Sequence, residues 1–367
     1  MAYTLINTSI ITSDLKKPVL KEKSVIIEAG TITNVASNSL DSKEIGKFDC
    51  KGHYLIPLMI NASADLTHNI DIPYDLNTEY IESKKLFKKN KYLKLAKNNA
   101  YNEIISGTST VKSFEGNTNI NKKLRIGINN HTIIGPKILY SLDIRFDNTN
   151  PNSYFISTKE DIKKLENNLM NIGPTFFDIN LDNSNVELVN SLFDLALKHS
   201  IKVCYRFSNR SILKDIKLDN TLLDGDIIDE DIKLFERKKV AFISNLTSSK
   251  NKDLRKETLI LLKKNNIDIA LGNMAGINNS HTSFVDEIIE VKNILNLTNQ
   301  EALNMATLGN AKILGIDMDN GSIAPGMLAN IAVYKNNPLD DLNILKEKPL
   351  VMILKGQFKQ DKDLELK

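Results

Sequence analysis

The sequence contains few cysteines: Cys50 and Cys204 are the only two in 367 residues. They lie far apart in the chain, each within an apolar, strand-like stretch. A disulfide framework needs several closely spaced cysteines, so this pattern favours reduced, buried thiols and a cytoplasmic protein. Because apolar surroundings disfavour the thiolate, neither residue is predicted to be a catalytic nucleophile.

Long apolar runs are also missing from the sequence. No window approaches the roughly 18 uninterrupted apolar residues that a membrane-spanning helix requires. The N-terminal stretch MAYTLINTSIITSDLKK lacks a basic segment followed by a continuous apolar one, so we do not expect a signal peptide. The net charge is only +3 at pH 7, and no basic stripe with interleaved aromatic residues occurs. We therefore expect neither a membrane nor a nucleic acid as a partner.

The chain does contain enough apolar residues, 41%, for one large domain and a smaller one. Short β-like runs occupy both ends of the chain, and Gly and Pro punctuate the C-terminal runs. We interpret these two ends, residues 1–56 and 320–367, as halves of one discontinuous β-sandwich. Residues 57–319 then form the second predicted domain.

That central region alternates short apolar strands with amphipathic helices. Capping boxes predict two of the helices, one from Ser184 with Glu187 and one from Thr298 with Glu301, the second helix ending at Gly315. Eight strands with helical crossovers indicate an α/β fold, the (β/α)8 barrel. The predicted strands span residues 55–62, 108–114, 132–140, 176–181, 201–207, 221–225, 239–244 and 268–272.

Several long stretches resemble the amidohydrolase superfamily, in particular its imidazolonepropionase-like branch. The run CKGHYLIPLMINASADL is similar to the motif GkyllPGLIDxHxHL, with which the barrel of that superfamily begins. The run EALNMATLGNAKILGIDMDNGSIAPGMLANIAVYKNNPL is similar to its C-terminal ending, and AYNEIISGTSTVKSF and IIGPKIL resemble two motifs in between. The resemblance implies a metal centre at the C-terminal mouth of the barrel, where one or two divalent ions activate a water for hydrolysis.

The positions at which the superfamily carries its metal ligands hold other residues in this chain. The resemblance implies two histidines on strand one, a lysine or glutamate on strand four, single histidines on strands five and six, and an aspartate on strand eight. In chain order, these positions fall on Ser63, Asp65, Asn180, Arg206, Asp224 and Met274. A methionine thioether cannot accept a proton at neutral pH, so the implied chemistry has no general base. No other catalytic signature, such as G-x-S-x-G or a Walker pattern, replaces it. We expect no metal or other cofactor.

Arg206 is expected to balance the charge that a lost dication leaves behind. Buried carboxylates are costly without a partner, and one guanidinium can bridge two of them. We therefore predict that Arg206 bridges Asp65 and Asp224. The alternative is that these positions drifted into solvent-filled slots. His68 is the one histidine expected near the barrel mouth, where it is either an accessory site residue or, as we favour, an exposed loop residue.

Three functions remain open on these observations. The favoured one is a catalytically degenerate protein that binds a small molecule, or a partner such as an active relative. The second is a divergent hydrolase of non-peptide C–N bonds, either metal-free or using Asp65, Asp224 and His68 with a hard metal. The third is a structural or oligomerisation subunit. Homo-oligomerisation is implied only by the resemblance.

Overall fold

The computed structural model describes residues 2–37, 46–68, 70 and 89–358. The chain divides into two compact units, each assembled from segments that are distant in sequence. The first unit comprises Met1–Ile60, Asn102–Ser109 and Ile288–Lys367, and the second comprises Asn61–Tyr101 and Thr110–Glu287. Among the described residues, no helix is long and apolar enough to cross a membrane.

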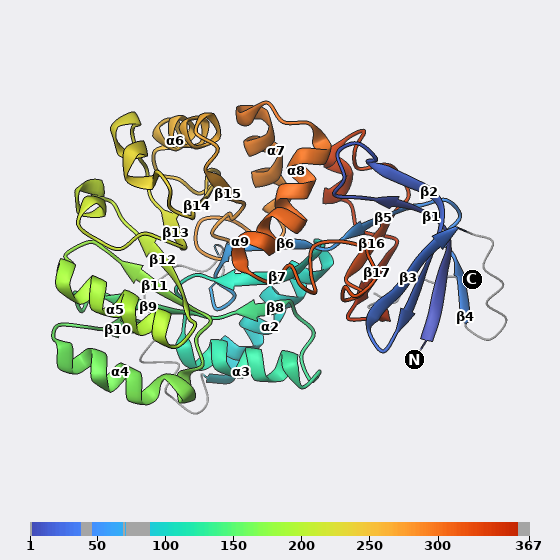
Figure 1. The fold of residues 1–367 in the computed structure, drawn as a ribbon. Coiled ribbons are helices and arrows are strands. Elements are labelled where there is room, and N and C mark those ends of the chain that lie inside the picture. Colours follow the sequence, from blue (N-terminus) through green and yellow to red (C-terminus); the bar gives the residue numbers. More distant parts are fainter. Residues whose placement is uncertain (1, 38–45, 69, 71–88, 359–367) are drawn as a thin grey trace. The chain divides into compact units, whose positions relative to one another are not determined.

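The first unit contains one mixed sheet that joins the two ends of the chain (Figure 1). Its strand order is β18-β17-β16-β5-β1-β2-β3, and β4 pairs with β1 in parallel. Strand β5 from the N-terminal end is antiparallel to β16 from the C-terminal end, which confirms that the terminal segments pair. The strands are β1 Ala2–Ile11, β2 Val19–Glu28, β3 Thr31–Ser37, β4 Gly46–Asp49, β5 Tyr54–Pro57, β16 Ile331–Tyr334, β17 Val351–Leu354 and β18 Gln357–Phe358.

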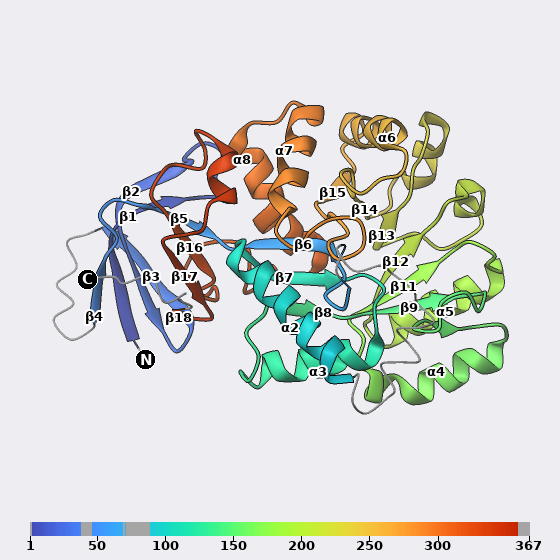
Figure 2. The same cartoon turned by 180° about the vertical axis from the view of Figure 1, so that it is seen from behind.

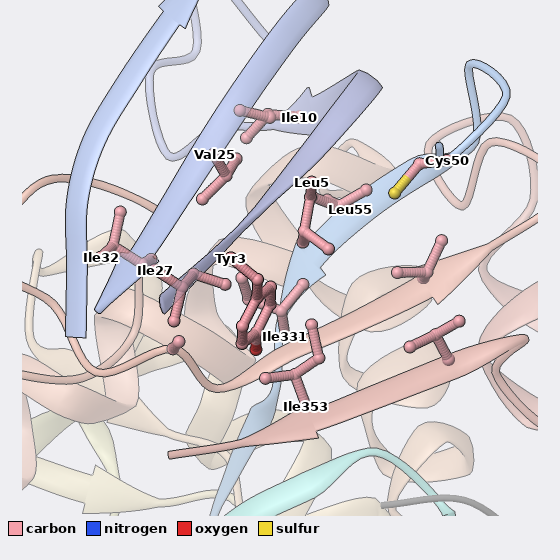
Figure 3. Close-up of a cluster of buried hydrophobic side chains, with 13 residues drawn as sticks. Tyr3, Leu5, Ile10, Val25, Ile27, Ile32, Cys50, Leu55, Ile331 and Ile353 are labelled. Carbon is pink, nitrogen blue, oxygen red and sulfur yellow. The ribbon is translucent and has the colours of Figure 1, made fainter. Parts of the chain in front are cut away.

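A hydrophobic core lies against this sheet (Figure 3). Branched and aromatic side chains from strands of both chain ends contribute to it, including Leu5, Val25, Ile331 and Ile353, and each of these four is almost fully buried. Such side chains suit the pleated surface of a sheet. Cys50 lies at the edge of the same cluster and is buried, and so is Cys204; both thiols are free, as predicted.

Parallel strands dominate the second unit. One sheet has the order β10-β9-β11-β12-β13-β14-β15, and another has the order β6-β7-β8. From β11 to β15 each strand is parallel to the next in sequence, as expected when crossovers connect them. The strands are β6 Met59–Ala64, β7 Thr108–Ser113, β8 Lys137–Leu139, β9 Ser141–Arg145, β10 Tyr154–Phe155, β11 Phe176–Asn180, β12 Lys202–Arg206, β13 Thr221–Asp224, β14 Val240–Ile243 and β15 Asp268–Ala270.

Helices connect most of these strands and pack on them; α5 contacts β12 and α6 contacts β15 (Figures 1 and 2). The α-helices are α2 Lys89–Ile105, α3 Thr118–Asn129, α4 Lys159–Ile172, α5 Val186–Lys198, α6 Lys252–Lys264, α7 Phe284–Leu295, α8 Asn299–Asn304 and α9 Asn310–Leu314. The short helical turns are η1 Arg210–Lys214, η2 Asp229–Phe235, η3 Met305–Gly309, which is π-helical, and η4 Leu342–Lys346.

One of the two predicted helix starts is correct. Thr298 and Glu301 form the expected capping box, and Gly315 ends the segment in the left-handed conformation, with a φ of 71°. The other start is displaced by one residue, because Asn185 and not Ser184 caps α5. The Asn185 Oδ1 accepts hydrogen bonds from the amides of Glu187 (2.9 Å) and Leu188 (3.2 Å). Asn is at least as good a cap as Ser, so the local sequence offered two candidates.

Two predicted strands differ from the observed ones. The first, 55–62, is in fact two strands, β5 and β6, because the Leu58 amide donates to Asn330 O (3.0 Å) at the switch between sheets. The third, 132–140, begins only at Lys137 and continues after Tyr140 as β9. Apolar runs alone give no signal for such a change of sheet. All the other predicted strands are present with shifted ends.

Hydrogen bonds also connect the two parallel sheets of the second unit to each other. The Ser141 amide at the start of β9 donates to Ser113 Oγ at the end of β7 (2.7 Å). The Ala62 amide in β6 donates to Leu271 O, just after β15 (2.9 Å), and Ala64 forms a parallel bridge with Ala275. The second unit is therefore an α/β array whose parallel strands follow one another in sequence.

Candidate functional site

Charged side chains lie in strands that are otherwise apolar. Lys112 in β7, Asp143 in β9, Asp178 in β11 and Arg206 in β12 are all buried. Asp178 in β11 is the register partner of Asp143 in β9. On its other side Asp178 is the register partner of Cys204 in β12, and Arg206 lies two residues further along β12. Because side chains alternate along a strand, residues in register or two apart face the same side. Asp143, Asp178 and Arg206 therefore gather on one face.

Arg206 is the centre of this group. Its Nε donates to Asp178 Oδ1 (2.8 Å), its Nη1 donates to Glu115 Oε1 (2.6 Å), and its Nη2 contacts Asp143 Oδ1. The guanidinium also lies over the ring of Phe114, 4.7 Å from its centroid. One planar cation thus binds three carboxylates through all three of its nitrogens, which fits the fixed fork of donors that arginine carries.

Two further cations complete the arrangement. Lys112 Nζ donates to Asp178 Oδ2 (3.0 Å), and its side chain is fully buried. Arg145 Nε donates to Asp143 Oδ2 (3.0 Å), and its Nη2 donates to Glu115 Oε1 (2.7 Å). We call this group the charged cluster; it contains three cations and three carboxylates, so its formal charge is zero. Its members are Lys112, Glu115, Asp143, Arg145, Asp178 and Arg206.

Burial and pairing act in opposite directions on the carboxylates. Burial raises the pKa of Asp143 to about 6, although Arg206 and Arg145 oppose the shift. Burial also disfavours the charged form of Asp178, but Lys112 and Arg206 together outweigh it and lower the pKa of Asp178. Burial likewise disfavours the charged form of Arg206, but Asp143, Asp178 and Glu115 raise its pKa well above the usual value. Arg206 is therefore permanently charged.

The prediction that Arg206 bridges Asp65 and Asp224 is wrong. Asp224 instead accepts hydrogen bonds from Asn245 Nδ2 (2.9 Å) and Arg255 Nη1 (3.3 Å). Arg206 does balance buried carboxylates, as expected, but they are different ones. Strand position does not exclude Asp224, because it is the register partner of Arg206 on β13. Arg206 donates instead to Asp178 of β11, and Asp224 pairs with Arg255 of α6.

Asp65 is part of a small hydrogen-bonded group of its own. Its Oδ1 accepts from the amide (2.8 Å) and the hydroxyl (2.7 Å) of Thr67, and its Oδ2 contacts His68 Nδ1. His68 is only 6% exposed, so the favoured prediction of an exposed loop residue is wrong. The main-chain oxygen of His68 contacts His281 Nε2 (3.0 Å), and this second histidine is buried as well.

The remaining predicted positions make local contacts. Ser63 is fully buried in β6, and its hydroxyl has no hydrogen-bond partner among the described residues. Asn180 Oδ1 accepts from the Asp182 amide (2.9 Å), which closes a turn after β11. Met274 follows β15, is half-buried and has a φ of 47°. None of the three belongs to the charged cluster.

The charged cluster does not fit a divalent cation. Its three carboxylates already face cations of this chain, and adding a dication would leave a buried excess of positive charge. Within the part of the chain that the structure describes, no group of three or more His, Cys, Asp or Glu side chains is arranged to hold a metal ion.

Sequence reasoning identified only Arg206 among the members of the charged cluster. Lys112, Asp143 and Asp178 each interrupt an apolar strand, in STVKSF, YSLDIR and FFDIN. A charged residue is rarely buried unless it is paired, so each interruption was a signal that charges meet inside the fold. Glu115 and Arg145 stand at the ends of their strands, and nothing in the sequence distinguishes them from loop residues.

Comparison with known proteins gives a match to a family over part of the chain, and a fold. The Amidohydrolase family matches residues 191–359. No curated protein sequence matches the chain.

Among solved structures, a Bifidobacterium longum protein assigned as a prolidase is 20% identical, with a TM-score of 0.80 over 99% of this chain and 97% of its own. A Xaa-Pro dipeptidase with bound methionine is 15% identical, with a TM-score of 0.83 over 98% and 100%. An adenosine deaminase from Xanthomonas campestris with bound zinc is 14% identical, with a TM-score of 0.75 over 97% and 92%. At these identities, structural likeness shows the fold alone.

Proposed function

We propose that this chain is a catalytically degenerate member of the amidohydrolase superfamily that binds a small molecule without a metal. The family match over residues 191–359 and the fold support its membership. The observation that carries the proposal is the contact of Arg206 with Glu115, Asp143 and Asp178. A fixed cation of the chain stands at the strand-five position where the resemblance implies a metal ligand.

Charge balance supports the metal-free part of the proposal. The cluster is neutral as it stands, and Arg206 stays charged because three carboxylates raise its pKa. Binding a dication would require Arg206 to leave or the cluster to carry excess buried charge, and both are costly. Met274 supports the loss of chemistry, since a thioether in the general-base position cannot take a proton from water.

We further infer that the parallel strands close into a (β/α)8 barrel over residues 57–319, with residues 1–56 and 320–367 forming a β-sandwich domain. The hydrogen bond from Ala62 to Leu271 O (2.9 Å) and the bridge between Ala64 and Ala275 support closure, because they join the first strand to the last. Residues 38–45 and 359–367 of the proposed sandwich lie outside the described residues.

The proposed ligand is a small amide, lactam or cyclic imide held at the mouth of the barrel, where loops after the strands bind ligands in this fold. In the alternative, the chain binds a partner protein instead of a small molecule, either an active relative or a second copy of itself. The cytoplasm is the proposed location. Superfamily membership supports the ligand class, because the hydrolysed bond in such enzymes is of this type.

Metal content tests the proposal directly. Protein purified without chelators is analysed by inductively coupled plasma mass spectrometry, and we expect far less than one equivalent of any divalent metal. A thermal-shift screen with amides, lactams and cyclic imides follows, in which a ligand raises the melting temperature without being consumed. Stoichiometric metal, or turnover of the stabilising compound, contradicts the proposal. A complete lack of ligand shifts favours the structural role instead.

A metal-free hydrolase is the second candidate, and the contact of His68 Nδ1 with Asp65 Oδ2 favours it. A carboxylate that holds one imidazole nitrogen orients the ring and can make it a general base. If a compound from the screen is hydrolysed, Asp65→Asn and His68→Gln variants should each lower kcat and change its pH profile. Arg206→Lys should then leave the pH profile unchanged. Equal loss in all three variants would indicate a structural effect and exclude the pair as catalyst.

A further inference from the structure

A cavity lies in the first unit, beside the core of the mixed sheet, and it is independent of the charged cluster. Its volume is about 190 Å³, and its described lining comes from β1, β4, β16, β17 and β18, from the residues that follow β4 and from Leu350, just before β17. An apolar cavity of roughly 150 Å³ is already large enough to stay dry and bind benzene.

The walls of the cavity are aliphatic and aromatic. Leu5, Val333 and Val351 form the aliphatic part and belong to the core of the sheet. Phe48 and Phe358 form the aromatic part, with their ring centroids 4.7 Å apart. Apolar surface buried against such walls provides the free energy for binding an apolar ligand.

Tyr3 holds the aromatic wall in place. Its ring meets Phe48 edge-on, with centroids 5.6 Å apart, and lies 5.0 Å from Phe358. The Tyr3 hydroxyl donates to Gly356 O (2.9 Å), which fixes the ring at the hairpin between β17 and β18. The aromatic wall is therefore preformed. A ligand ring that enters the cavity can pack against Phe48 and Phe358 in the tilted or edge-on arrangement that aromatic pairs prefer.

The polar side of the cavity carries opposite charges. Asp49 and Lys51 both line it, together with His53 and the thiol of Cys50. Asp49 is partly satisfied by the Lys51 amide (2.8 Å) and by Asn7 Nδ2 (2.9 Å). Because Asp49 and Lys51 balance, this side favours neither a cation nor an anion, and a charged ring would lose its hydration on entering the apolar part.

We propose that this cavity is a binding site for a neutral, single-ring aromatic compound with one polar substituent. The ring lies between the aliphatic wall and the pair Phe48 and Phe358, and the substituent faces Asp49, Lys51 and His53. Cys50 lines the cavity as a neutral thiol, because burial raises its pKa to about 12. The site needs no metal and does not depend on the function proposed for the charged cluster.

Ligand-observed ¹⁹F NMR with 4-fluorophenol tests the site in the full-length protein. We expect 4-fluorophenol to bind and unlabelled phenol to displace it, whereas benzoate and benzylamine, ionised at neutral pH, displace it much less. No binding of 4-fluorophenol, or equal displacement by all three competitors, would overturn the proposal.

Two cysteine substitutions locate the binding. Cys50→Leu fills the cavity and should weaken 4-fluorophenol binding about tenfold or more, since one methylene in an apolar pocket is worth that much. Cys204→Ala is the control, because Cys204 is also a buried free cysteine but belongs to the second unit, and it should leave binding nearly unchanged. Leu350→Phe fills the cavity from a half-buried wall residue and serves if Cys50→Leu does not fold. Undiminished binding in a folded filling variant would place the compound elsewhere and refute the assignment.

Discussion

Replacing Arg206 by methionine removes the centre of the charged cluster while keeping a side chain of similar length. The three carboxylates of Glu115, Asp143 and Asp178 then share only Lys112 and Arg145. Removing one partner from a buried ion pair costs about 3–5 kcal/mol, because the other charge stays buried without compensation. For a unit of this size, that loss lowers the melting temperature by roughly 6–20 °C.

A second substitution separates lost charge balance from lost packing. Adding Asp143→Asn to Arg206→Met leaves two cations and two carboxylates. The double variant should therefore lose less stability than the sum of the single variants, with a coupling of about 0.5–3 kcal/mol. If the two losses add without coupling, the stability of the cluster does not depend on its charge balance.

Arg210→Met is the matched control for this experiment. Arg210 also forms an ion pair, with Asp231 (3.2 Å), but its side chain is 44% exposed. An exposed pair contributes about 0–1 kcal/mol, so the control should unfold nearly as the wild type does in urea. Both variants are measured by urea unfolding at neutral pH. Equal destabilisation by Arg206→Met and Arg210→Met would show that the buried position of Arg206 adds nothing to its contribution.

Three further predictions concern pH, backbone conformation and helix capping. Burial raises the pKa of Asp143 from the ordinary aspartate value of 3.8 to about 6 in the folded chain, so the folded state holds the proton more tightly than the unfolded state does. The contribution of Asp143 to the free energy of unfolding is therefore full below pH 4, and it falls by about 3 kcal/mol as the pH rises through 6. Urea unfolding across this pH range should show this fall in the wild type and not in Asp143→Asn. Gly116→Ala should destabilise the chain by more than Gly52→Ala in the same assay, because both have positive φ but only at Gly116 would the new Cβ come within 2.5 Å of Asp65 Oδ1; equal losses would refute the clash. Thr298→Ala should cost about 1 kcal/mol through loss of the capping box, whereas Ser184→Ala, which does not cap α5, should cost little.

Periodic and local patterns of the sequence predicted much of the fold. Strand β7 follows from a short run rich in the β-branched residues Thr and Val, and the helix start at Thr298 follows from a capping box. Both signals depend on neighbours only a few residues away. The N-cap at Asn185 was missed because Ser184 offered an equally good local signal. The split of residues 55–62 was missed because the change of sheet at Leu58 depends on a hydrogen bond to Asn330, far away in the chain.

The candidate site was predictable only in part, for the same reason. The sequence placed Arg206 at a ligand position and gave it the role of balancing carboxylates, but it named Asp65 and Asp224 as the partners. Register places Asp224 beside Arg206 as well, so strand pairing alone does not select the partners. The direction of the Arg206 side chain, toward Asp143 and Asp178, and the approach of Arg255 to Asp224 are tertiary contacts.

By itself, then, the sequence determined the alternation of strands and helices, which follows from residue identity and short-range spacing. Its resemblance to the amidohydrolase superfamily predicts that six ligand positions hold other residues. Only the tertiary structure decided that Arg206 binds Glu115, Asp143 and Asp178, that His68 is buried against Asp65, and that an aromatic-walled cavity lies beside Cys50. Electrostatic energy and packing depend on distances between groups remote in sequence, and those distances exist only once the strands have paired.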